Sequence, residues 1–446
     1  MRRSRMLRGI AAAAALTLTL AACGDDDDTD AADSEETAEE TEDDGEAAEE
    51  EESPDPEDLD IDRPGRDDVL DLGYVLPESG DLAFLGAPQI TGVQMAVEEI
   101  NDEGGVNDSD VTLETGDEAN NAAIAQQNTA RLINAGVDAV VGAAASGMSQ
   151  EIIQLLHDNQ IVQCSASNTS PDFTEHEANE FYQRTVPPDE AVTPVIVDTL
   201  LNDGHQDIAI VARADDYGIG LADLVQENFE AAGGSVVARN DYDPRTADFS
   251  PEVSDVTGAD PDAVVVIAFG EGATFIRQAI ESGISADQIY GSDGLFGPGL
   301  VDDVNPDDSG FIAGMTVIGA AGGEDFNSRL EEQLPEDESG NYIYGGQAYD
   351  CTIIIALATI AADSVDPVDI NDEIDGVTKD GEQCTTFAEC RDLLDDGEDI
   401  DYEGASGPLE IDGADPAFGR YAIAEFQDDG SLEVVGDQDI DLADLQ

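Results

Sequence analysis

Small hydroxyl-bearing residues follow two apolar runs within one stretch of the sequence, residues 140–173. Ser146 comes after the run 137–141, and the polar residues 165–170 come after the shorter run 161–164. Hydroxyl groups and free backbone N–H groups at helix starts stabilise anions, so this stretch favours the binding of an anion, most simply a carboxylate. The same residues are alternatively ordinary helix N-caps, and the stretch by itself leaves both interpretations open.

The elements that must position these hydroxyls are two strands and the helices that follow them. Residues 137–141 are predicted to form a buried parallel strand, and Ser146 begins a predicted helix whose apolar residues follow helical spacing. Residues 161–164 are predicted to form a second, short strand. Because open α/β sheets bind ligands at the carboxyl ends of their strands, we expect both loops to contribute to one site.

Predicted strands and helices alternate through most of the chain. The predicted strands are residues 69–77, 111–115, 139–142, 161–164, 208–212, 235–238, 263–268, 288–291 and 314–318, and the predicted helices include 119–135, 191–202, 220–232, 272–282 and 349–362. This alternation is typical of parallel sheets with right-handed crossovers, and so many units predict an α/β fold with two lobes. The polar residues 185–191 are the expected passage between lobes, and the short strands after residue 384 are expected to be antiparallel.

The charge balance disfavours some classes of partner. The 446 residues include 16 basic and 104 acidic ones, which gives a net charge of -88. Such acidity disfavours direct binding to nucleic acid or to an anionic bilayer. Residues 24–68 account for only part of it, so the folded region is acidic as well. We expect the chain to be most stable in high salt, where repulsion between surface charges is screened.

The N-terminal residues are expected to direct export. Residues 1–22 combine four arginines with an apolar run and are predicted to be a lipoprotein signal peptide. Small residues precede Cys23, as at acylation sites, so we expect lipid on Cys23 to anchor the chain to a membrane of the cell envelope. The alternative is a plain secretory signal with an incidental cysteine. The acidic residues 23–68 are predicted to be an extended, disordered tether.

The remaining cysteines divide into two kinds. Cys384 and Cys390 lie in a polar segment, and in an exported protein their close spacing predicts a local disulfide. Cys164 falls in a predicted buried strand and Cys351 in an apolar helix, and both are predicted to be buried free thiols.

No motif predicts catalysis. The histidines are His157, His176 and His205, and they show no metal-binding spacing. The sequence contains no nucleophile elbow, no Ser-x-x-Lys and no phosphate-binding Gly-x-x-x-x-Gly-Lys. We therefore expect no catalytic residue, no metal and no cofactor.

Several stretches resemble the type I periplasmic binding proteins of ABC importers, specifically the branched-chain amino-acid (Leu/Ile/Val) binding group. The stretches are GYVLPESGDLAFLGAPQITGVQMAVEEINDEGGVN, VDAVVGAAASGMS, CSASNTSPDF, YQRTVPPDE, DDYGIGLAD, DYDPRTADFSPEV, PDAVVVIAFGEGATFIRQA, YGSDGLF and GASGPLEID. The resemblance implies two Rossmann-like lobes with parallel sheets, joined by three hinge crossings, with the ligand in the cleft between them. We expect lobe 1 at residues 69–189 and about 318–380, and lobe 2 at 190–317 and about 381–446.

The resemblance also implies ligand-binding roles for residues of the first lobe. Ser146 matches the hydroxyl that binds the ligand carboxylate, and Thr169 matches a second contact, to carboxylate and ammonium. Ser167 and Asn168 match positions that offer main-chain groups.

From the second lobe, Glu271 matches the acid that pairs with the ligand ammonium, and Tyr217 matches an aromatic residue at the cleft. Glu271 is alternatively a first-turn acid that favours the helix dipole, and Tyr217 a packing residue at the lobe edge. Asp293 in GSDG is either a pocket acid or a turn residue. The wall of the side-chain pocket is expected at Phe84 or Leu85, and at Tyr342 or Tyr344.

The sequence thus predicts a monomeric, lipid-anchored solute receptor outside the cytoplasm. By resemblance it delivers a small amino acid, branched-chain in the first instance, to a permease with ATPase subunits. Two alternatives stay open, a ligand-sensing module of the same fold and a binder of amides or urea. An envelope amide hydrolase is a third hypothesis, which the lack of a nucleophile–base pair disfavours.

Overall fold

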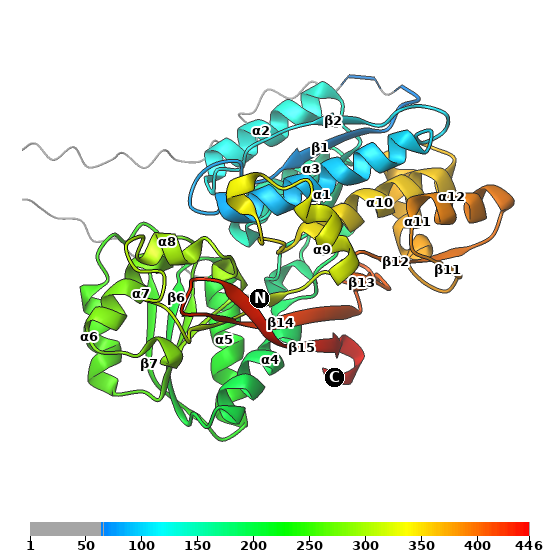
Figure 1. Cartoon of the computed structure of the whole chain (residues 1–446). Helices are drawn as coiled ribbons and strands as arrows, with labels where there is room; N and C mark the ends of the chain where they lie inside the picture. The colour runs from blue at the N-terminus through cyan, green and yellow to red at the C-terminus, as the bar shows by residue number, and fades with distance from the viewer. Residues whose placement is uncertain (1–63, 66, 446) are drawn as a thin grey trace, which may run out of the picture. The chain divides into compact units, whose positions relative to one another are not determined.

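The computed structural model describes residues 64, 65 and 67–445 (Figure 1). The predicted signal peptide (1–22), the predicted lipidation site Cys23 and almost all of the predicted tether (23–68) lie outside these residues. The described chain forms two large sheets with helices on both faces and a third, small sheet.

The first sheet has the strand order β2-β1-β3-β4-β5, and all neighbouring strands are parallel. Its strands are β1 (Asp71–Val75), β2 (Thr112–Glu114), β3 (Ala139–Gly142), β4 (Val162–Ser165) and β5 (Tyr182–Arg184). Helices α2 (Ala122–Ala135) and α3 (Ser146–Asp158) bury apolar side chains against one face. Helices α1 (Ala83–Asp102) and α10 (Gly345–Ala362) pack against each other, and α10 covers β3 and β4 from the other face.

The second sheet has the order β15-β14-β10-β9-β8-β6-β7, of which β14 and β15 are antiparallel and the others parallel. Its strands are β6 (Asp207–Arg213), β7 (Ser235–Tyr242), β8 (Ala263–Ile267), β9 (Ile289–Gly291), β10 (Thr316–Ala320), β14 (Phe418–Phe426) and β15 (Leu432–Asp441). Helices α4 (Asp189–Asn202) and α5 (Asp216–Ala231) contribute to one buried core, and α6 (Ser250–Ala259), α7 (Gly272–Glu281) and α8 (Leu300–Val304) to another. The sheet is therefore covered on both faces.

The third sheet joins β11 (Glu382–Cys384), β12 (Ile400–Gly404) and β13 (Gly407–Pro408). With α9 (Glu324–Glu331), α11 (Pro367–Val377) and α12 (Phe387–Asp396), it packs around α10 and α1.

The predicted boundaries of the two lobes need correction at the small sheet and at β10. Residues 381–409 lie with the first sheet and not with lobe 2, because their side chains complete the core around α10, and β10 belongs to the second sheet.

The chain passes between the two large sheets at residues 185–188, 321–323 and 409–417. The predicted α/β fold is confirmed, and every predicted strand is present with ends shifted by a few residues. The structure adds short elements that the sequence did not predict, among them β5, α6, α9, α11 and α12. Short 3-10 turns are η2 (Pro171–Phe173), η3 (Asn179–Phe181), η4 (Ala286–Gln288), η5 (Asp293–Leu295), η6 (Glu336–Glu338) and η7 (Leu442–Leu445).

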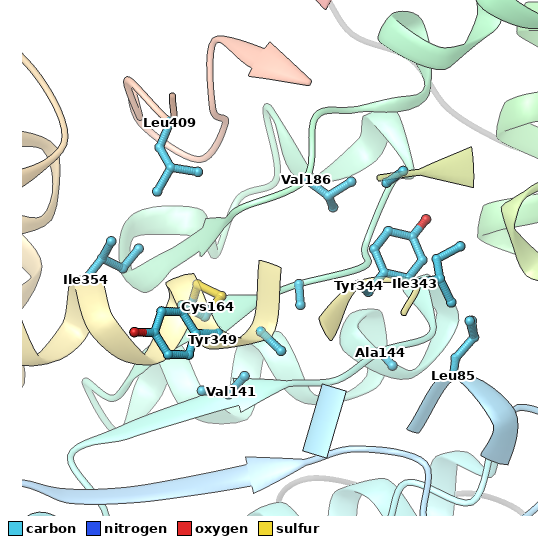
Figure 2. Close-up of a cluster of buried hydrophobic side chains, with 14 of the residues drawn as sticks. Leu85, Val141, Ala144, Cys164, Val186, Ile343, Tyr344, Tyr349, Ile354 and Leu409 are labelled. Atoms are coloured by element: carbon cyan, nitrogen blue, oxygen red, sulfur yellow. A yellow bond between two sulfur atoms is a disulfide. The ribbon is translucent and has the colours of Figure 1, made fainter. Parts of the chain in front are cut away.

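Two disulfides are present in the described chain. Cys384–Cys390 confirms the predicted local bond. The prediction of free thiols at Cys164 and Cys351 is wrong, because these residues form a second disulfide between β4 and α10. Figure 2 shows this bond among buried apolar side chains. The pairing escapes a reading of the sequence because 187 residues separate the two cysteines, and only the packing of α10 on β4 brings them together.

Helix α10 is the most apolar helix of the described chain. It alone in that part is long and apolar enough to cross a membrane, yet 83% of it is buried inside the fold. Its contacts with α1, α11 and β4 account for this burial. Its composition is therefore that of a core helix, which is apolar all round.

Candidate functional site

Two loops follow β3 and β4, which are neighbours in the first sheet. The first loop turns sharply at Gly142, whose φ is 114°. A Cβ atom there would lie 2.1 Å from the carbonyl oxygen of Val75, so only glycine lets β3 pass β1 this closely. The chain then enters α3, of which Ser146 is the first residue. The predicted strand–loop–helix arrangement around Ser146 is thus present.

Hydrogen bonds join the two loops. Asn168 Nδ2 donates to the carbonyl oxygens of Ala143 and Ala144, at 3.1 and 2.8 Å. Ser167 Oγ donates to the carbonyl oxygen of Ala144 at 3.0 Å. The side chains of Ser167 and Asn168 are therefore engaged in holding the loops together. Their amides donate to Ser165 Oγ, at 3.4 and 3.2 Å, so their predicted main-chain contacts with a ligand stay predictions.

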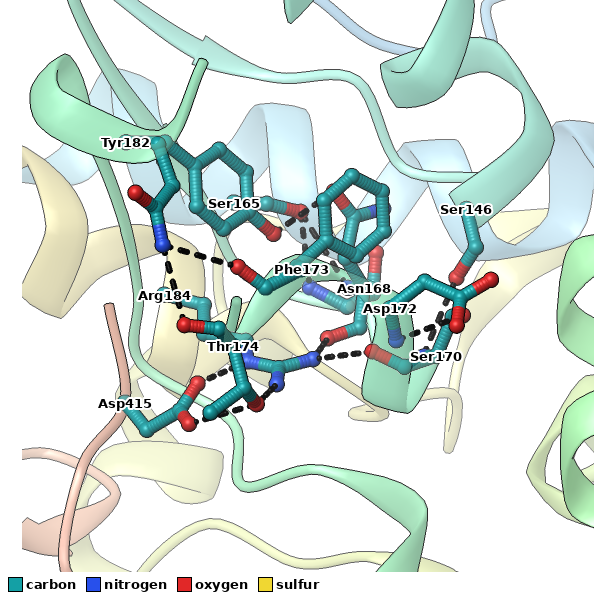
Figure 3. Close-up of polar contacts among 12 residues, drawn as sticks. Ser146, Ser165, Asn168, Ser170, Asp172, Phe173, Thr174, Tyr182, Arg184 and Asp415 are labelled. Atoms are coloured by element: carbon teal, nitrogen blue, oxygen red, sulfur yellow. Dashed lines mark hydrogen bonds and ion pairs between the residues drawn. The ribbon is translucent and has the colours of Figure 1, made fainter. Parts of the chain in front are cut away.

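Arg184 supports the second loop (Figure 3). It is fully buried, and its Nη1 donates to the carbonyl oxygens of Asn168 and Ser170, at 2.9 and 2.8 Å. Its Nε donates to Asp415 Oδ1 at 2.6 Å. Asp415 belongs to the third crossing, so one side chain holds both the loop and a hinge segment. Arg184 was not among the predicted site residues.

The start of α3 offers hydrogen-bond donors. The N–H groups of Ser146 and Gly147, and that of Thr169 in the second loop, make no hydrogen bond within the described chain. Ser146 Oγ accepts the amide of Ser170 at 3.4 Å, which leaves its own proton available. Donors at a helix N-terminus stabilise negative charge. This end of the site suits a carboxylate, as the sequence predicts for Ser146 and Thr169.

The second sheet contributes a buried carboxylate, Asp293, in the turn after β9. Its Oδ1 lies 2.5 Å from the hydroxyl of Tyr217, and its Oδ2 lies 2.6 Å from the hydroxyl of Tyr344. Tyr217 belongs to α5 and Tyr344 precedes α10, so side chains from both lobes meet at Asp293. No lysine or arginine of the described chain pairs with this carboxylate.

Three further buried groups lack hydrogen-bond partners in the described chain: both carboxylate oxygens of Asp189, the hydroxyl of Thr169 and the hydroxyl of Tyr421. They come from the start of α4, the second loop and β14. The amide of Asp189 donates to the carbonyl oxygen of Thr169 at 2.8 Å, so these two residues are adjacent. Unpartnered buried polar groups are costly, and several together indicate a place where a ligand supplies the missing bonds.

The electrostatics of this region favour a cation. Burial, and after it the negative charge of Asp293, raise the pKa of Asp189 well above its usual value. Burial also raises the pKa of Asp293, against the opposing effect of the bonds from Tyr217 and Tyr344. A positive group beside these carboxylates would favour their ionised forms and offset the cost of burying them.

Glu271, the predicted partner of an ammonium group, is engaged elsewhere. Its Oε1 accepts bonds from Arg213 Nη1 at 2.8 Å and from the hydroxyl of Tyr242 at 2.9 Å. Its Oε2 is buried without a partner. Arg213 also lies 2.5 Å from Asp215, so its charge is shared between two acids. The ligand role of Glu271 stays a prediction. The FGEG and GSDG turns both place an acid directly after a strand of the second sheet, and of the two acids only Glu271 has an arginine partner in the described chain.

A cavity of about 580 Å³ opens beside Asp293. Phe84 lines it, together with Gly294 and Leu295. Of the alternatives for the pocket wall, Phe84 faces this cavity, whereas Leu85 is buried in the core.

Neither alternative for the second wall residue lines this cavity. Tyr344 donates to Asp293, whereas the half-buried Tyr342 makes no hydrogen bond to it. The choice between Tyr342 and Tyr344 as a wall residue stays open.

Asp189 and Tyr421 were not predicted. Asp189 follows two prolines at the start of a helix, where an acid is ordinary, and Tyr421 fits the alternation of a strand. The only indication of a role for Asp189 was that it lies in YQRTVPPDE, one of the stretches that resemble the family. In the described region, no group of three or more His, Cys, Asp and Glu side chains could hold a metal ion.

Comparison with known proteins gives a consistent result. The family model described as "Periplasmic binding protein" matches residues 70–396. The Leu/Ile/Val-binding protein BraC3 of Rhizobium johnstonii is 28% identical over 228 residues, which are 50% of this chain and 61% of BraC3. The leucine-, isoleucine-, valine-, threonine- and alanine-binding protein of Pseudomonas aeruginosa is 26% identical over 309 residues, 67% of this chain and 80% of that protein. The chain thus spans less than two thirds of BraC3.

Solved structures share the fold. The leucine-binding protein LivK of Thermotoga maritima superposes with a TM-score of 0.70 at 22% identity, over 84% of this chain and 100% of LivK. A solute-binding protein of R. palustris, in complex with 4-hydroxybenzoate, superposes with a TM-score of 0.67 at 18% identity, over 83% of this chain and 97% of that protein. The same fold therefore occurs with ligands of different chemistry.

Proposed function

We propose, for a chain that belongs to the periplasmic binding protein family, the role of solute-binding protein of an ABC importer, with a small amino acid as its solute. The solute-binding role rests on the family, and the names of the relatives support an amino acid. The charge pattern of the site supports an amino acid over other solutes.

The observation that carries the amino-acid assignment is the charge pattern of the site. Asp189 and Asp293 are buried without a basic partner and would bind an α-ammonium group. Ser146 and Thr169 offer donors for an α-carboxylate. Charge-assisted hydrogen bonds of this kind contribute roughly 1.5–3 kcal/mol each. A neutral or purely anionic solute would leave both aspartates unpaired.

We further propose that binding closes the two lobes. The carboxylate end of the site comes from the first sheet, whereas Asp293 comes from the second, so one ligand is held at both ends only when the lobes meet. Contacts between the lobes include the Tyr344–Asp293 bond and the amide of Gly270, which donates to the carbonyl oxygen of Asp81 at 3.3 Å. A ligand that bridges the lobes shifts the population toward such a closed form.

The side chain of the ligand would extend toward the cavity beside Asp293. The wall of that cavity is mixed: Phe84 and Leu295 form an apolar part that would contact an aliphatic side chain, whereas Asp81, Asp302, Asp303 and Glu338 are acidic. Its volume of about 580 Å³ admits leucine, isoleucine and valine alike. We therefore propose the branched-chain class and no single member of it.

The test is calorimetric titration of the purified protein in molar salt with leucine, isoleucine, valine, urea, short amides and 4-hydroxybenzoate. We expect tight binding of at least one aliphatic amino acid, weakened about a hundredfold by Asp293→Asn. Glu271→Gln serves as the comparison. Because Arg213 already pairs with Glu271, the amino-acid affinity of this variant should change much less.

Two results would count against this assignment. Tight binding of 4-hydroxybenzoate or an amide with no binding of amino acids would refute the zwitterion site, and the solute-binding role would stand. A large loss of amino-acid affinity in Glu271→Gln, with no loss in Asp293→Asn, would show that Glu271 binds the ammonium group, as the sequence predicts.

We also propose that the protein is held outside the cytoplasm by lipid on Cys23 and that its partner is a permease with ATPase subunits. The family supports an extracytoplasmic location. The anchor is tested by labelling cells with a radioactive fatty acid. Label and membrane association that persist in Cys23→Ser would refute it.

A further inference from the structure

Two adjacent acids, Asp117 and Glu118, lie in the loop between β2 and α2, where the sequence analysis placed no site residue. The backbone here continues the pairing of the first sheet beyond the strands. The amide of Leu76 donates to the carbonyl oxygen of Gly116 at 2.9 Å, and the amide of Glu118 donates to the carbonyl oxygen of Leu76 at 3.2 Å. The two acids are thus anchored beside the carboxyl end of β1.

Glu118 holds the loop that precedes Ser146. It is fully buried, and its two carboxylate oxygens accept the amides of Ala144 and Ala145, at 2.7 and 3.2 Å. The carbonyl groups on this stretch point the other way, toward the second loop, where Asn168 bonds to them. Glu118 therefore fixes the orientation of the peptide groups that connect the two ligand loops.

Asp117 holds a different loop of the same site. Its Oδ1 accepts the amides of Glu78 and Ser79, at 3.0 and 3.3 Å, and its Oδ2 accepts the hydroxyl of Ser79 at 2.6 Å. This loop follows β1 and leads to Asp81, whose carbonyl oxygen bonds to Gly270 of the other lobe, and then to Phe84 at the cavity. Asp117 thus supports the loop that leads to α1, and its neighbour Glu118 supports the loop that leads to α3.

Neither acid is paired with lysine or arginine in the described chain. The donors to their oxygens are backbone N–H groups and one hydroxyl. An amide side chain of the same shape can accept at one atom only, because its NH₂ group would face another donor. Replacing either carboxylate by its amide should therefore release part of one loop without removing bulk.

We propose that Asp117 and Glu118 are positioning residues for ligand binding. Through backbone amides, Asp117 holds the loop after β1 and Glu118 holds the loop before Ser146, each in its binding conformation. The affinity part of this proposal rests on the function proposed above, and amide exchange tests the rest without any ligand.

The experiment compares Asp117→Asn and Glu118→Gln with a matched control, Asp350→Asn. Like Glu118, Asp350 is fully buried and accepts two amides, those of Ala405 and Ser406, at 2.7 and 2.8 Å. It also accepts the hydroxyl groups of Tyr402 and Ser406, and it lies in α10 and supports the small sheet. Each variant is studied by hydrogen exchange of the ligand-free protein, by thermal unfolding, and by calorimetry with leucine as the probe.

We expect faster exchange at residues 144–145 in Glu118→Gln, at 78–79 in Asp117→Asn and at 405–406 in Asp350→Asn. All three variants should lower the unfolding temperature, but only the first two should weaken leucine binding, by about tenfold. Unchanged exchange at the named amides would overturn the proposal. So would leucine affinities equal to that of the wild type, or an equal loss in Asp350→Asn. If leucine does not bind the wild type, the proposed solute fails, and the exchange pattern still supports or overturns the positioning of the loops.

Discussion

The two disulfides close loops of very different length, which allows a quantitative test of how the fold is stabilised. Cys164–Cys351 spans a sequence separation of 187 residues, and Cys384–Cys390 spans 6. A cross-link removes conformational entropy from the unfolded chain, and this effect grows with the logarithm of the loop length. For these separations the relation gives about 5 kcal/mol for the long loop and about 2 kcal/mol for the short loop.

The perturbation is the removal of each bond by a pair of alanines, Cys164→Ala with Cys351→Ala, and Cys384→Ala with Cys390→Ala. All four side chains are at most 1% exposed, so the lost packing of sulfur is similar in both variants and largely cancels in the comparison. The free energy of unfolding is measured with urea in molar salt, followed by circular dichroism. We expect the first variant to lose about 3 kcal/mol more than the second.

Equal losses in the two variants would refute this reasoning, because the packing terms are matched and only loop length differs. A larger loss in the short-loop variant would show that local contacts in the small sheet outweigh chain entropy. Thiol titration of the denatured wild type is the necessary control. Reactive thiols at Cys164 and Cys351 would mean that the long cross-link does not form in solution.

Three further predictions concern buried charge and salt. Arg184→Met should cost about 3–5 kcal/mol in urea unfolding, because it leaves Asp415 and two loop carbonyl groups without their partner; a cost below about 1 kcal/mol would contradict it. Burial raises the pKa of Glu118 from 4.5 to about 8, so the folded chain holds this proton more tightly than the unfolded chain. Its contribution to stability is present below pH 4.5 and is lost as the pH rises to about 8, and Glu118→Gln should flatten that part of the urea-unfolding profile. The unfolding temperature should rise from about 0.1 M to about 2 M salt, and a flat or falling trend would contradict the role of surface repulsion.

The sequence predicted those features of the fold that depend on local patterns. Apolar runs and helical spacing located the strands and the larger helices, including the strand–loop–helix arrangement around Ser146. The carboxylate-binding roles of Ser146 and Thr169 stay predictions. The small sheet was assigned to the wrong lobe because its strands are too short to show which core they complete.

Contacts between distant residues were not predicted. Arg184, which the sequence did not indicate, meets Asp415 across 231 residues. Tyr344 and Asp293 were each named as one of two alternatives, but their contact across 51 residues was not expected. Glu271 and Asp293 have the same local setting, an acid in a turn after a strand. What separates them is Arg213, which reaches Glu271 from β6 and leaves Asp293 without a basic partner. No local pattern in the sequence carries that information.

The partners of the buried acidic side chains connect the fold to the proposed ligand. In a chain with 104 acidic and 16 basic residues, arginine and lysine cannot pair with every buried carboxylate. Backbone amides donate to Glu118, backbone amides and two hydroxyl groups donate to Asp350, and Arg213 pairs with one oxygen of Glu271. Asp189 forms no ion pair with arginine or lysine in the described chain; burial and nearby Asp293 raise its pKa well above the usual value, although Thr169 and the charge of Arg184 oppose this rise. Because an unpaired buried charge is costly, burial favours the neutral forms of these two aspartates, and we propose that the positive group of the ligand is what stabilises their ionised forms.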